Sequence, residues 1–257
     1  MKIQLIRHAT LIVSVNNKRI LVDPVLSEAG SMAPIENVPN QNYNPLVALP
    51  IDIDNITNCD AIIVTHTHRD HFDDTAAKLL SKNIPIFCQP DDEIKLRSYG
   101  FNDVHPINTT FIWNDIVFNR TNGKHGHDEL AIKMAPVSGF VMTCCGEPTV
   151  YIAGDTVWCK EVEDSIDKFK PDIVVCNCGG AQFDHGEPIT MTTKDIYALC
   201  LRYSSLKVVA VHMEAWNHCR LSRKDLINYI NINNININNI NTNVLIPQNG
   251  EELSFVF

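Results

Sequence analysis

The chain has 257 residues, 45% of them hydrophobic and 20% charged, which is typical of a globular protein and excludes a mainly disordered chain. Its formal net charge of -9 at pH 7 argues against general binding to nucleic acid or anionic membranes, because both require a basic surface. No run approaches the roughly 18 consecutive apolar residues of a membrane helix. Arg7 and His8 also interrupt the N-terminal stretch where a signal peptide would be apolar. We therefore expect a cytoplasmic protein that forms one domain over residues 1–257.

The first third of the chain predicts β-structure. Three short runs rich in β-branched residues, 3–6, 10–15 and 19–24, predict strands, and "NNK" between the last two predicts a hairpin. Residues 25–58 follow, rich in Pro, Asn, Gly and Ser, and predict a long loop. Because loops of this length in compact domains are usually lids or binding loops, we expect this one to take part in function.

After this loop, helices and further strands alternate. Strands are predicted at 61–65, 84–88, 110–113, 116–120, 139–145, 149–154, 172–177 and 207–212. Helices are predicted near 73–82, 91–99, 160–169 and 192–203. Two successive blocks, each rich in strands first and alternating later, favour two sheets packed face to face with helices outside.

The nine cysteines include no CxxC pair. Adjacent cysteines such as Cys144 and Cys145 rarely bridge one another, so we expect reduced thiols. Cys176 and Cys178 are candidates for structural zinc, but buried small hydrophobic residues are the simpler interpretation.

Residues 228–243, "NYININNININNINTN", are of low complexity. Leu226, Ile227 and Ile230 continue an apolar helix face, but the later isoleucines are two or three residues apart and fit no single period. We expect a helix end that passes into a loop. An Asn ladder that aggregates or binds a partner is the alternative.

The stretch "AIIVTHTHRDHFDD", residues 61–74, places histidines and aspartates directly behind an apolar strand. Such groups are costly to hold near a core without partners. His66 and His68 are two residues apart and point to the same side of an extended segment, which suits two ligands of one metal ion. Asp70 and His71 fall in the turn before the next helix and face a neighbouring point. The motif therefore predicts two adjacent metal sites rather than a polar capping loop.

Further candidate ligands lie at the ends of later elements. Asp155 ends the strand in "VYIAGDT", and His212 ends the strand in "VVAVH". His125 lies between Gly123 and Gly126, in a tight turn that exposes it. Alone, each has an ordinary explanation as a helix cap, a core histidine or a turn residue. Together with the first motif, they supply the ligands that a pair of ions needs.

These motifs resemble the metallo-β-lactamase fold superfamily. The string "THTHRDH", an isolated histidine, "GDT" and a late strand-terminal histidine carry the resemblance. The stretches "RHATLIVSVNNKRILVDPVL" and "VYIAGDT" are similar to its metal-dependent hydrolases related to L-ascorbate-6-phosphate lactonase. The similarity spans nearly the whole chain. It implies an α+β fold, a four-layer αββα sandwich of two mixed sheets flanked by helices, with a dinuclear site at the sheet edges.

The resemblance also implies how seven side chains share two ions. They are His66, His68 and His125 on one ion, Asp70, His71 and His212 on the other, and Asp155 bridging both. Histidine at the second ligand position, where flavo-diiron oxygen reductases use a carboxylate, favours hydrolysis over redox chemistry. His127 is an alternative to His125 as the third ligand, although the Gly-Lys-His-Gly turn favours His125.

Imidazole and carboxylate ligands without cysteine favour Zn²⁺, with Mn²⁺ and Fe²⁺ as alternatives. Two such ions lower the pKa of a shared water toward about 7 and supply hydroxide at neutral pH. Asp70 would orient this water and accept its proton. We therefore expect a hydrolase whose partner is a small molecule, either a lactone, an ester or a phosphoester.

Three residues are candidates for substrate binding. His185 lies in the Gly-rich stretch "GGAQFDHGEPITM", and Trp158 and His218 closely follow two of the proposed ligands. Each also has a simpler interpretation, as a surface histidine or a packing aromatic residue. His8 resembles a family position near the site, and Asp23 in "LVDP" is a candidate to orient a ligand histidine.

Two other functions are alternatives. A phosphodiesterase or ribonuclease similar to tRNA 3′-processing enzymes shares the metal motif, but this chain is acidic and shows no basic arm. A non-catalytic metal-binding protein is the second. Related lactonases assemble, so a homo-oligomer is open by analogy.

Overall fold

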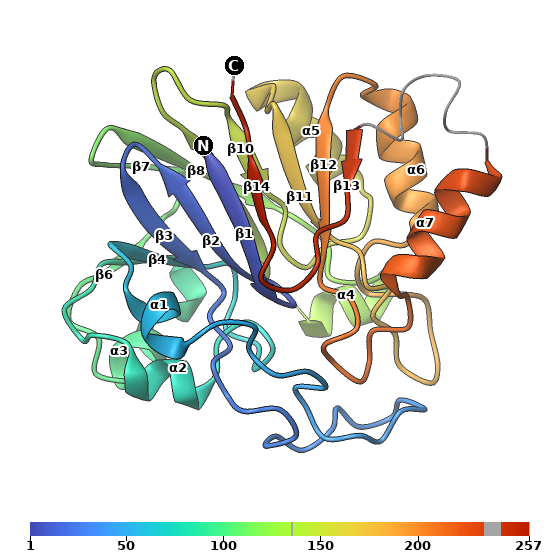
Figure 1. Ribbon diagram of the computed structural model, residues 1–257, viewed down its shortest axis with the longest axis horizontal. Coiled ribbons are helices and arrows are strands. Elements are labelled where there is room, and N and C mark those ends of the chain that lie inside the picture. Colours follow the sequence, from blue (N-terminus) through green and yellow to red (C-terminus); the bar gives the residue numbers. More distant parts are fainter. Residues whose placement is uncertain (135, 234–242, 257) are drawn as a thin grey trace.

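The computed structural model describes residues 1–134, 136–233 and 243–256. Two mixed β-sheets of seven strands each pack face to face (Figure 1). In spatial order, the first sheet contains β14 (Glu252–Ser254), β1 (Lys2–Arg7), β2 (Thr10–Val15), β3 (Lys18–Val22), β4 (Ala61–Val64), β5 (Ile86–Cys88) and β6 (Val104–Pro106). The second contains β13 (Val244–Leu245), β12 (Lys207–Val211), β11 (Ile173–Asn177), β10 (Val150–Ile152), β9 (Ser138–Thr143), β8 (Ile116–Asn122) and β7 (Thr110–Trp113).

Helices cover the outer faces of both sheets. On the first sheet they are α1 (Ile53–Thr57), α2 (Asp74–Leu79) and α3 (Glu93–Ser98), with a 3-10 turn at Pro90–Asp92, and on the second they are α5 (Lys160–Phe169), α6 (Thr193–Arg202) and α7 (Arg223–Ile232). Helix α4 (Asp128–Met134) buries none of its residues and lies at one edge of the sandwich (Figure 1). In the described ranges no helix has the length and apolar character needed to cross a bilayer.

Three apolar clusters separate the four layers. Between the sheets, Phe87 of β5 stacks on Phe118 of β8 with ring centroids 4.7 Å apart. A second cluster joins the outer face of the second sheet to α5, α6 and α7, and a third joins the first sheet to α2 and α3. Strands such as β4 and β11 are buried along their whole length, because helices cover one face and the opposite sheet covers the other. The predicted αββα sandwich is confirmed.

Most predicted elements form, and the differences are in short or exposed segments. The loop predicted over residues 25–58 ends in helix α1, a five-residue helix whose N-cap Asp52 makes no side-chain hydrogen bond. Helix α4 was not predicted, because it buries none of its residues and so has no apolar periodicity. In the Asn-rich stretch, α7 continues to Ile232, and residues 234–242 lie outside the described residues. All nine cysteines are free thiols.

The long loop is held at its base by two buried charged side chains. The Arg7 guanidinium donates to the carbonyl oxygens of Val25 and Ser27 at 2.9 Å and of Val47 at 2.8 Å. Asp73 Oδ2 accepts from the backbone N–H of Leu26 at 3.0 Å and of Ser27 at 2.8 Å. The loop therefore has a fixed position along the edge of the sandwich (Figure 1).

Replacing Asp73 tests this anchorage. Asp73 also caps α2, since its Oδ1 accepts from the N–H of Ala76 at 2.7 Å. Asp73→Ala leaves three backbone N–H groups without this acceptor, so we expect the free energy of unfolding to fall by about 2–3 kcal/mol in urea denaturation. The exposed neighbour Asp74 is the matched control, and Asp74→Ala should change it by less than about 0.5 kcal/mol. Equal effects of the two variants would contradict the anchoring role.

Candidate metal centre

Histidines and carboxylates from both sheets meet at one edge of the sandwich. Strands β1, β3 and β4 run in the same direction in the first sheet, as do β8, β10, β11 and β12 in the second. The segments after their carboxyl ends carry the candidate residues, which are His8, Asp23, His66, His68, Asp70, His71, His125, Asp155 and His212. Except for His68, which is half-buried, all of them are buried.

The first group consists of His66, His68 and His125, whose candidate ligand atoms all lie within 4.8 Å of one another. His125 donates from Nδ1 to the carbonyl oxygen of Ile189 at 2.9 Å, which leaves Nε2 to face the group. The Nε2 atom of His66 is buried and has no hydrogen-bond partner in the described structure. Three imidazoles that converge in this way fit one metal ion.

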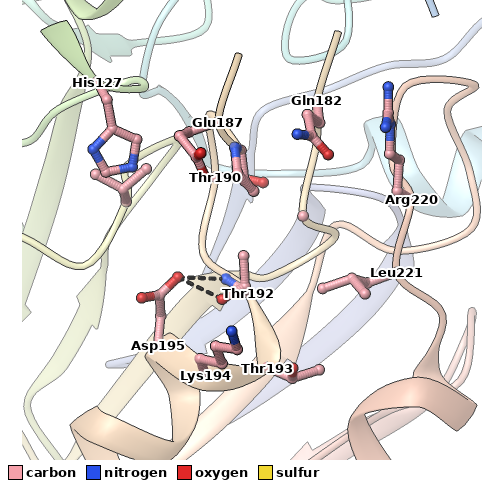
Figure 2. Close-up of a pocket in the computed structure, with 13 residues that line it drawn as sticks. His127, Gln182, Glu187, Thr190, Thr192, Thr193, Lys194, Asp195, Arg220 and Leu221 are labelled. Atoms are coloured by element: carbon pink, nitrogen blue, oxygen red, sulfur yellow. Dashed lines mark hydrogen bonds between the residues drawn. The ribbon is translucent and has the colours of Figure 1, made fainter. Parts of the chain in front are cut away.

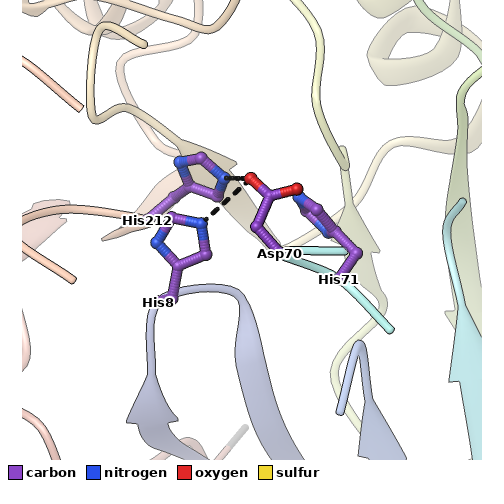
Figure 3. Close-up of side chains that lie close together, drawn as sticks. All are labelled: His8, Asp70, His71 and His212. Carbon is purple, nitrogen blue, oxygen red and sulfur yellow. Dashed lines mark hydrogen bonds and ion pairs between the residues drawn. The ribbon is translucent and has the colours of Figure 1, made fainter. Parts of the chain in front are cut away.

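The second group consists of His8, Asp70, His71 and His212, which also lie within 4.8 Å of one another. Figure 3 shows the Asp70 carboxylate directed at two imidazoles, with Oδ2 3.4 Å from His8 Nε2 and 3.7 Å from His212 Nε2. The ring centroids of His8 and His212 are 3.6 Å apart. This group fits a second ion, and it brings His8 closer to the centre than the sequence alone predicted.

Asp155 lies between the two groups. Its Oδ2 is 3.4 Å from His125 Nε2, and its Oδ1 is 3.3 Å from the Nε2 atoms of both His71 and His212. Asn177, at the end of β11, donates from Nδ2 to Asp155 Oδ1 at 2.7 Å and fixes the carboxylate. This arrangement gives each group access to one carboxylate oxygen.

The distances fit metal coordination better than direct hydrogen bonding. Ordinary hydrogen bonds between nitrogen and oxygen span 2.7–3.2 Å, whereas the pairs around Asp155 are 3.3–3.4 Å apart. Ligands bound tetrahedrally at 2.0–2.1 Å lie about 3.4 Å from one another. The Nε2 atoms of His71 and His212 and the Oδ2 atom of Asp155 are buried without a hydrogen-bond partner in the described structure. Divalent cations would satisfy all three.

Protonation in the cluster also suits cation binding. Burial lowers the pKa of His68 to about 4 and that of His66 well below its ordinary value, so both are neutral at pH 7. Burial raises the pKa of Asp70 and Asp155, but neighbouring histidines outweigh it and hold both values well below the usual range. Burial lowers the pKa of His71, but the carboxylates around it raise that pKa to about 10. The carboxylates therefore hold a positive charge at His71 that a metal ion would replace.

A second layer of contacts orients the imidazoles. Asp23 Oδ2 accepts from His71 Nδ1 at 2.8 Å and so orients the imidazole of a proposed ligand. Asp23 also accepts from the backbone N–H and the hydroxyl of Thr65, both at 2.7 Å. On the other side, Cys219 Sγ lies 3.5 Å from His212 Nδ1. These contacts direct the Nε2 atoms of His71 and His212 into the cluster.

A cavity of about 210 Å³ opens beside the cluster. His68, Asp70, His125 and His218 form its polar side. The remaining lining residues are mainly apolar and are Ile35, Met134, Phe183 and Ile189, together with Arg69. The size and lining suit a small molecule with an apolar substituent.

The structure separates the candidate substrate residues. His218 is buried, lines this cavity, and has its Nε2 3.4 Å from Asp70 Oδ2. His185 is exposed and lines a different hollow, and Trp158 packs against Tyr203 with ring centroids 6.3 Å apart. Neither residue lines the cavity at the cluster. Their positions in the sequence, in a Gly-rich loop and shortly after a proposed ligand, do not determine where their side chains point.

His125, rather than His127, lies in the cluster. His127 is exposed and lines a separate cavity of about 340 Å³ at the start of α6, with Lys194 and Arg220 (Figure 2). Gly126 between the two histidines has a φ of 107°, a conformation that favours glycine and turns the chain between them. Asn177 is not among the residues predicted from the sequence, although a polar residue at the end of an apolar strand is a usable signal.

The contact between Asp23 and His71 gives a test of the centre. We expect Asp23→Asn to weaken zinc binding by about 10- to 100-fold, because an amide is a weaker acceptor for the His71 N–H than a carboxylate. Competition with a chromophoric chelator measures this affinity. Asp60→Asn, at a partly exposed carboxylate in the same sheet region, is the matched control and should bind zinc normally. Unchanged zinc affinity in Asp23→Asn would contradict a role for Asp23 in orienting His71 for metal binding.

Comparisons with known proteins agree with this geometry. The family model described as a beta-lactamase superfamily domain matches residues 18–213. The chain is 40% identical over 260 residues to the UPF0173 protein YddR of Bacillus subtilis (strain 168), a match that covers 99% of this chain and 100% of that protein.

Two solved structures have similar folds. A possible metal-dependent hydrolase from Veillonella parvula DSM 2008 is 36% identical with a TM-score of 0.94, and covers 99% of both chains. An isothiocyanate hydrolase from Delia radicum gut bacteria is 34% identical with a TM-score of 0.93, again over 99% of both chains. The chain therefore belongs to the beta-lactamase superfamily, among its UPF0173 metal-dependent hydrolases.

Proposed function

We propose that the protein binds two divalent metal ions and uses hydroxide generated there to hydrolyse a small substrate with an electrophilic carbon and an apolar substituent. The position of Asp155 is the observation that carries the proposal. One of its oxygens faces His125, and the other faces His71 and His212, at distances of 3.3–3.4 Å. A single ion would leave one of these two groups of buried imidazoles without a partner.

The residues fall into two ligand sets that share this carboxylate. His66, His68 and His125 would hold the first ion, and Asp70, His71 and His212 the second, with Asp155 common to both. All of these ligand atoms are imidazole nitrogens or carboxylate oxygens, which favours Zn²⁺ over softer ions, with Mn²⁺ and Fe²⁺ as alternatives. Bound divalent ions would lower the pKa of water toward about 7 and so supply hydroxide at neutral pH.

Asp70 has the position of a catalytic carboxylate. It lies at the boundary between the second ligand set and the cavity, where it orients the attacking water and accepts its proton. His218 faces both Asp70 Oδ2 and the cavity, so its imidazole stabilises negative charge on Asp70 and contacts the bound substrate. His8 Nε2 also lies 3.4 Å from this oxygen.

Among substrates, organic isothiocyanates are the first candidate. Ile35, Met134, Phe183 and Ile189 give the cavity an apolar wall that suits an alkyl or aryl group. The isothiocyanate hydrolase that is 34% identical over 99% of both chains supports the same class. Addition of water across the C=N bond of R–N=C=S gives a thiocarbamic acid, which loses carbonyl sulfide and leaves the amine R–NH₂.

Small lactones and esters are the second candidate, because they also present an electrophilic carbon to hydroxide. Phosphoesters and RNA fit less well. Arg69 is the cationic residue in the described lining, and its guanidinium already donates to the Ala33 carbonyl at 2.5 Å and lies 5.7 Å from the Trp216 ring. The net charge of -9 also disfavours a polyanion.

Metal removal and two substitutions test the proposed centre. We expect about two zinc ions per chain by elemental analysis, and loss of hydrolysis after dialysis against a chelator with recovery on adding zinc. Asp70→Asn and His68→Ala should lower kcat by at least about 100-fold, because each removes a proposed ligand and Asp70 is also the proposed base. Their circular dichroism should stay unchanged. A chain that never binds metal, or that keeps its turnover in both variants, would contradict the proposal.

A substrate panel tests the chemistry separately from the metals. We expect turnover of 2-phenylethyl isothiocyanate, followed by release of the amine, to exceed turnover of γ-lactones and p-nitrophenyl esters, and bis-nitrophenyl phosphate to be the poorest substrate. A preference for the phosphodiester would favour the phosphodiesterase alternative. Full zinc loading with no turnover of any of these would favour a non-catalytic metal-binding protein.

A further inference from the structure

A buried amide joins the long loop to the segment that carries His212 and His218. Asn217 is 3% exposed, and its Oδ1 accepts from the backbone N–H of Ile35 at 3.0 Å and from Asn44 Nδ2 at 2.8 Å. Its Nδ2 donates to the carbonyl oxygens of Ile35 at 3.0 Å and of Asn40 at 2.7 Å. The backbone N–H of Asn217 in turn donates to Asn44 Oδ1 at 2.9 Å.

This set of bonds uses the full capacity of the side chain. A primary amide has two acceptor sites and two N–H donors, and all four are engaged here. An aspartate in its place has no donor for the two carbonyl oxygens, and an alanine leaves every partner unpaired. Because Asn217 and Asn44 are buried and the backbone groups of Ile35 and Asn40 are partly buried, lost bonds are costly, so the loop geometry depends on an amide at this position.

The position of Asn217 connects the cavity wall to the metal centre. Both backbone groups of Ile35 bond to this one side chain, and Ile35 lines the cavity. Trp216, directly before Asn217, is buried against the same loop and lies 5.8 Å from His8 between ring centroids. His218, directly after it, faces Asp70. The amide therefore fixes the distance between an apolar wall and the proposed reacting groups.

In the described structure, the part of the wall that Met134 forms is held by less. Met134 reaches the cavity from α4, a seven-residue helix in which no residue is buried. A wall formed by such a helix can adjust to a substrate at small cost, whereas hydrogen bonds to Asn217 hold the wall at Ile35 in place. The fixed wall then limits the size of the substituent that fits.

We propose that Asn217 is a specificity-determining positioning residue, which holds Ile35 against the substrate's apolar group and so sets the preference for that group. The expected effect on kinetics rests on the proposed hydrolysis. The hydrogen bonds between Asn217 and the loop do not depend on it. Asn217 itself does not line the cavity, so it acts through Ile35.

The experiment compares Asn217→Ala, Ile35→Ala and the double variant. We measure kcat/KM for 2-phenylethyl isothiocyanate and for methyl isothiocyanate, and take the ratio of the two. We expect either single variant to lower this ratio by about tenfold, mostly through a higher KM for the larger substrate. Because Asn217 acts through Ile35, the double variant should have the same ratio as Ile35→Ala. Additive effects in the double variant, or an unchanged ratio in Asn217→Ala, would overturn the inference.

Amide hydrogen exchange supplies a measurement that needs no turnover. Exchange at the Ile35 N–H should accelerate at least about tenfold in Asn217→Ala, because that N–H loses its acceptor. Zinc content should stay at the wild-type value. The exposed Asn42 of the same loop gives the matched control, and Asn42→Ala should change neither exchange at Ile35 nor the substrate ratio. Unchanged exchange in Asn217→Ala would show that Asn217 does not hold Ile35 in place, whatever the substrate.

The two proposals can fail separately. If the wild-type protein does not hydrolyse isothiocyanates but hydrolyses lactones, the proposed substrate class is wrong, and γ-butyrolactone and γ-octalactone replace the pair in the ratio. The expected loss of preference for the larger lactone then tests Asn217 in the same way. If isothiocyanates are hydrolysed and the ratio is unchanged, the inference fails while the proposed function stands.

Discussion

A buried carboxylate between the two sheets is the constraint on which the site depends. Asp155 comes from the second sheet, and it lies 3.3 Å from His71 of the first sheet and from His212 of the second. Carboxylates and imidazoles at this depth are stable only with compensating charge. The fold supplies part of it through a raised pKa at His71, and divalent ions would supply the rest. The packing of the two sheets and the proposed metal binding are therefore linked, because the residues that would hold the ions come from both sheets.

The backbone around the cluster supports this link. His212 donates its N–H to the carbonyl oxygen of His8 at 3.0 Å, which joins the end of β12 to the end of β1 across the two sheets. His8 and His212 have φ values of 60° and 67°, in the left-handed region that non-glycine residues adopt only when their surroundings compensate. Asp23, with a φ of 44°, is in the same region while it orients His71. Three residues that form or orient the cluster therefore share this conformation, whereas other residues with positive φ, such as Asn16 and Lys170, lie elsewhere in the chain.

The sequence predicted the candidate site best where His and Asp residues with ligand-like spacing directly follow a buried strand. The alternation in "HTHRDH" predicted two neighbouring groups, and the buried strands β4, β10 and β12 predicted where Asp155 and His212 would meet them. The structure brings all seven proposed ligands together, and their role as ligands stays part of the proposal. Sequence spacing could not place Trp158 or His185, because a side chain after a strand can point into the site or away from it. It could not reveal Asn217, whose four side-chain hydrogen bonds go to three residues of a loop 173–182 residues earlier in the chain.

In the proposed function, chemistry and selectivity depend on different parts of the molecule, and Ile189 belongs to both. The proposed ligands follow strand ends, whose positions the cores fix, whereas the cavity walls come from the long loop, from α4 and from the segment around Phe183 and Ile189. Ile189 lines the cavity, and its carbonyl oxygen accepts from His125 Nδ1. A change in the backbone there would therefore disturb a proposed ligand, whereas Met134 lies in a helix that carries none of the proposed ligands. We infer that relatives with the same centre can diverge in substrate most readily at α4 and the long loop, where walls can vary without disturbing the metals.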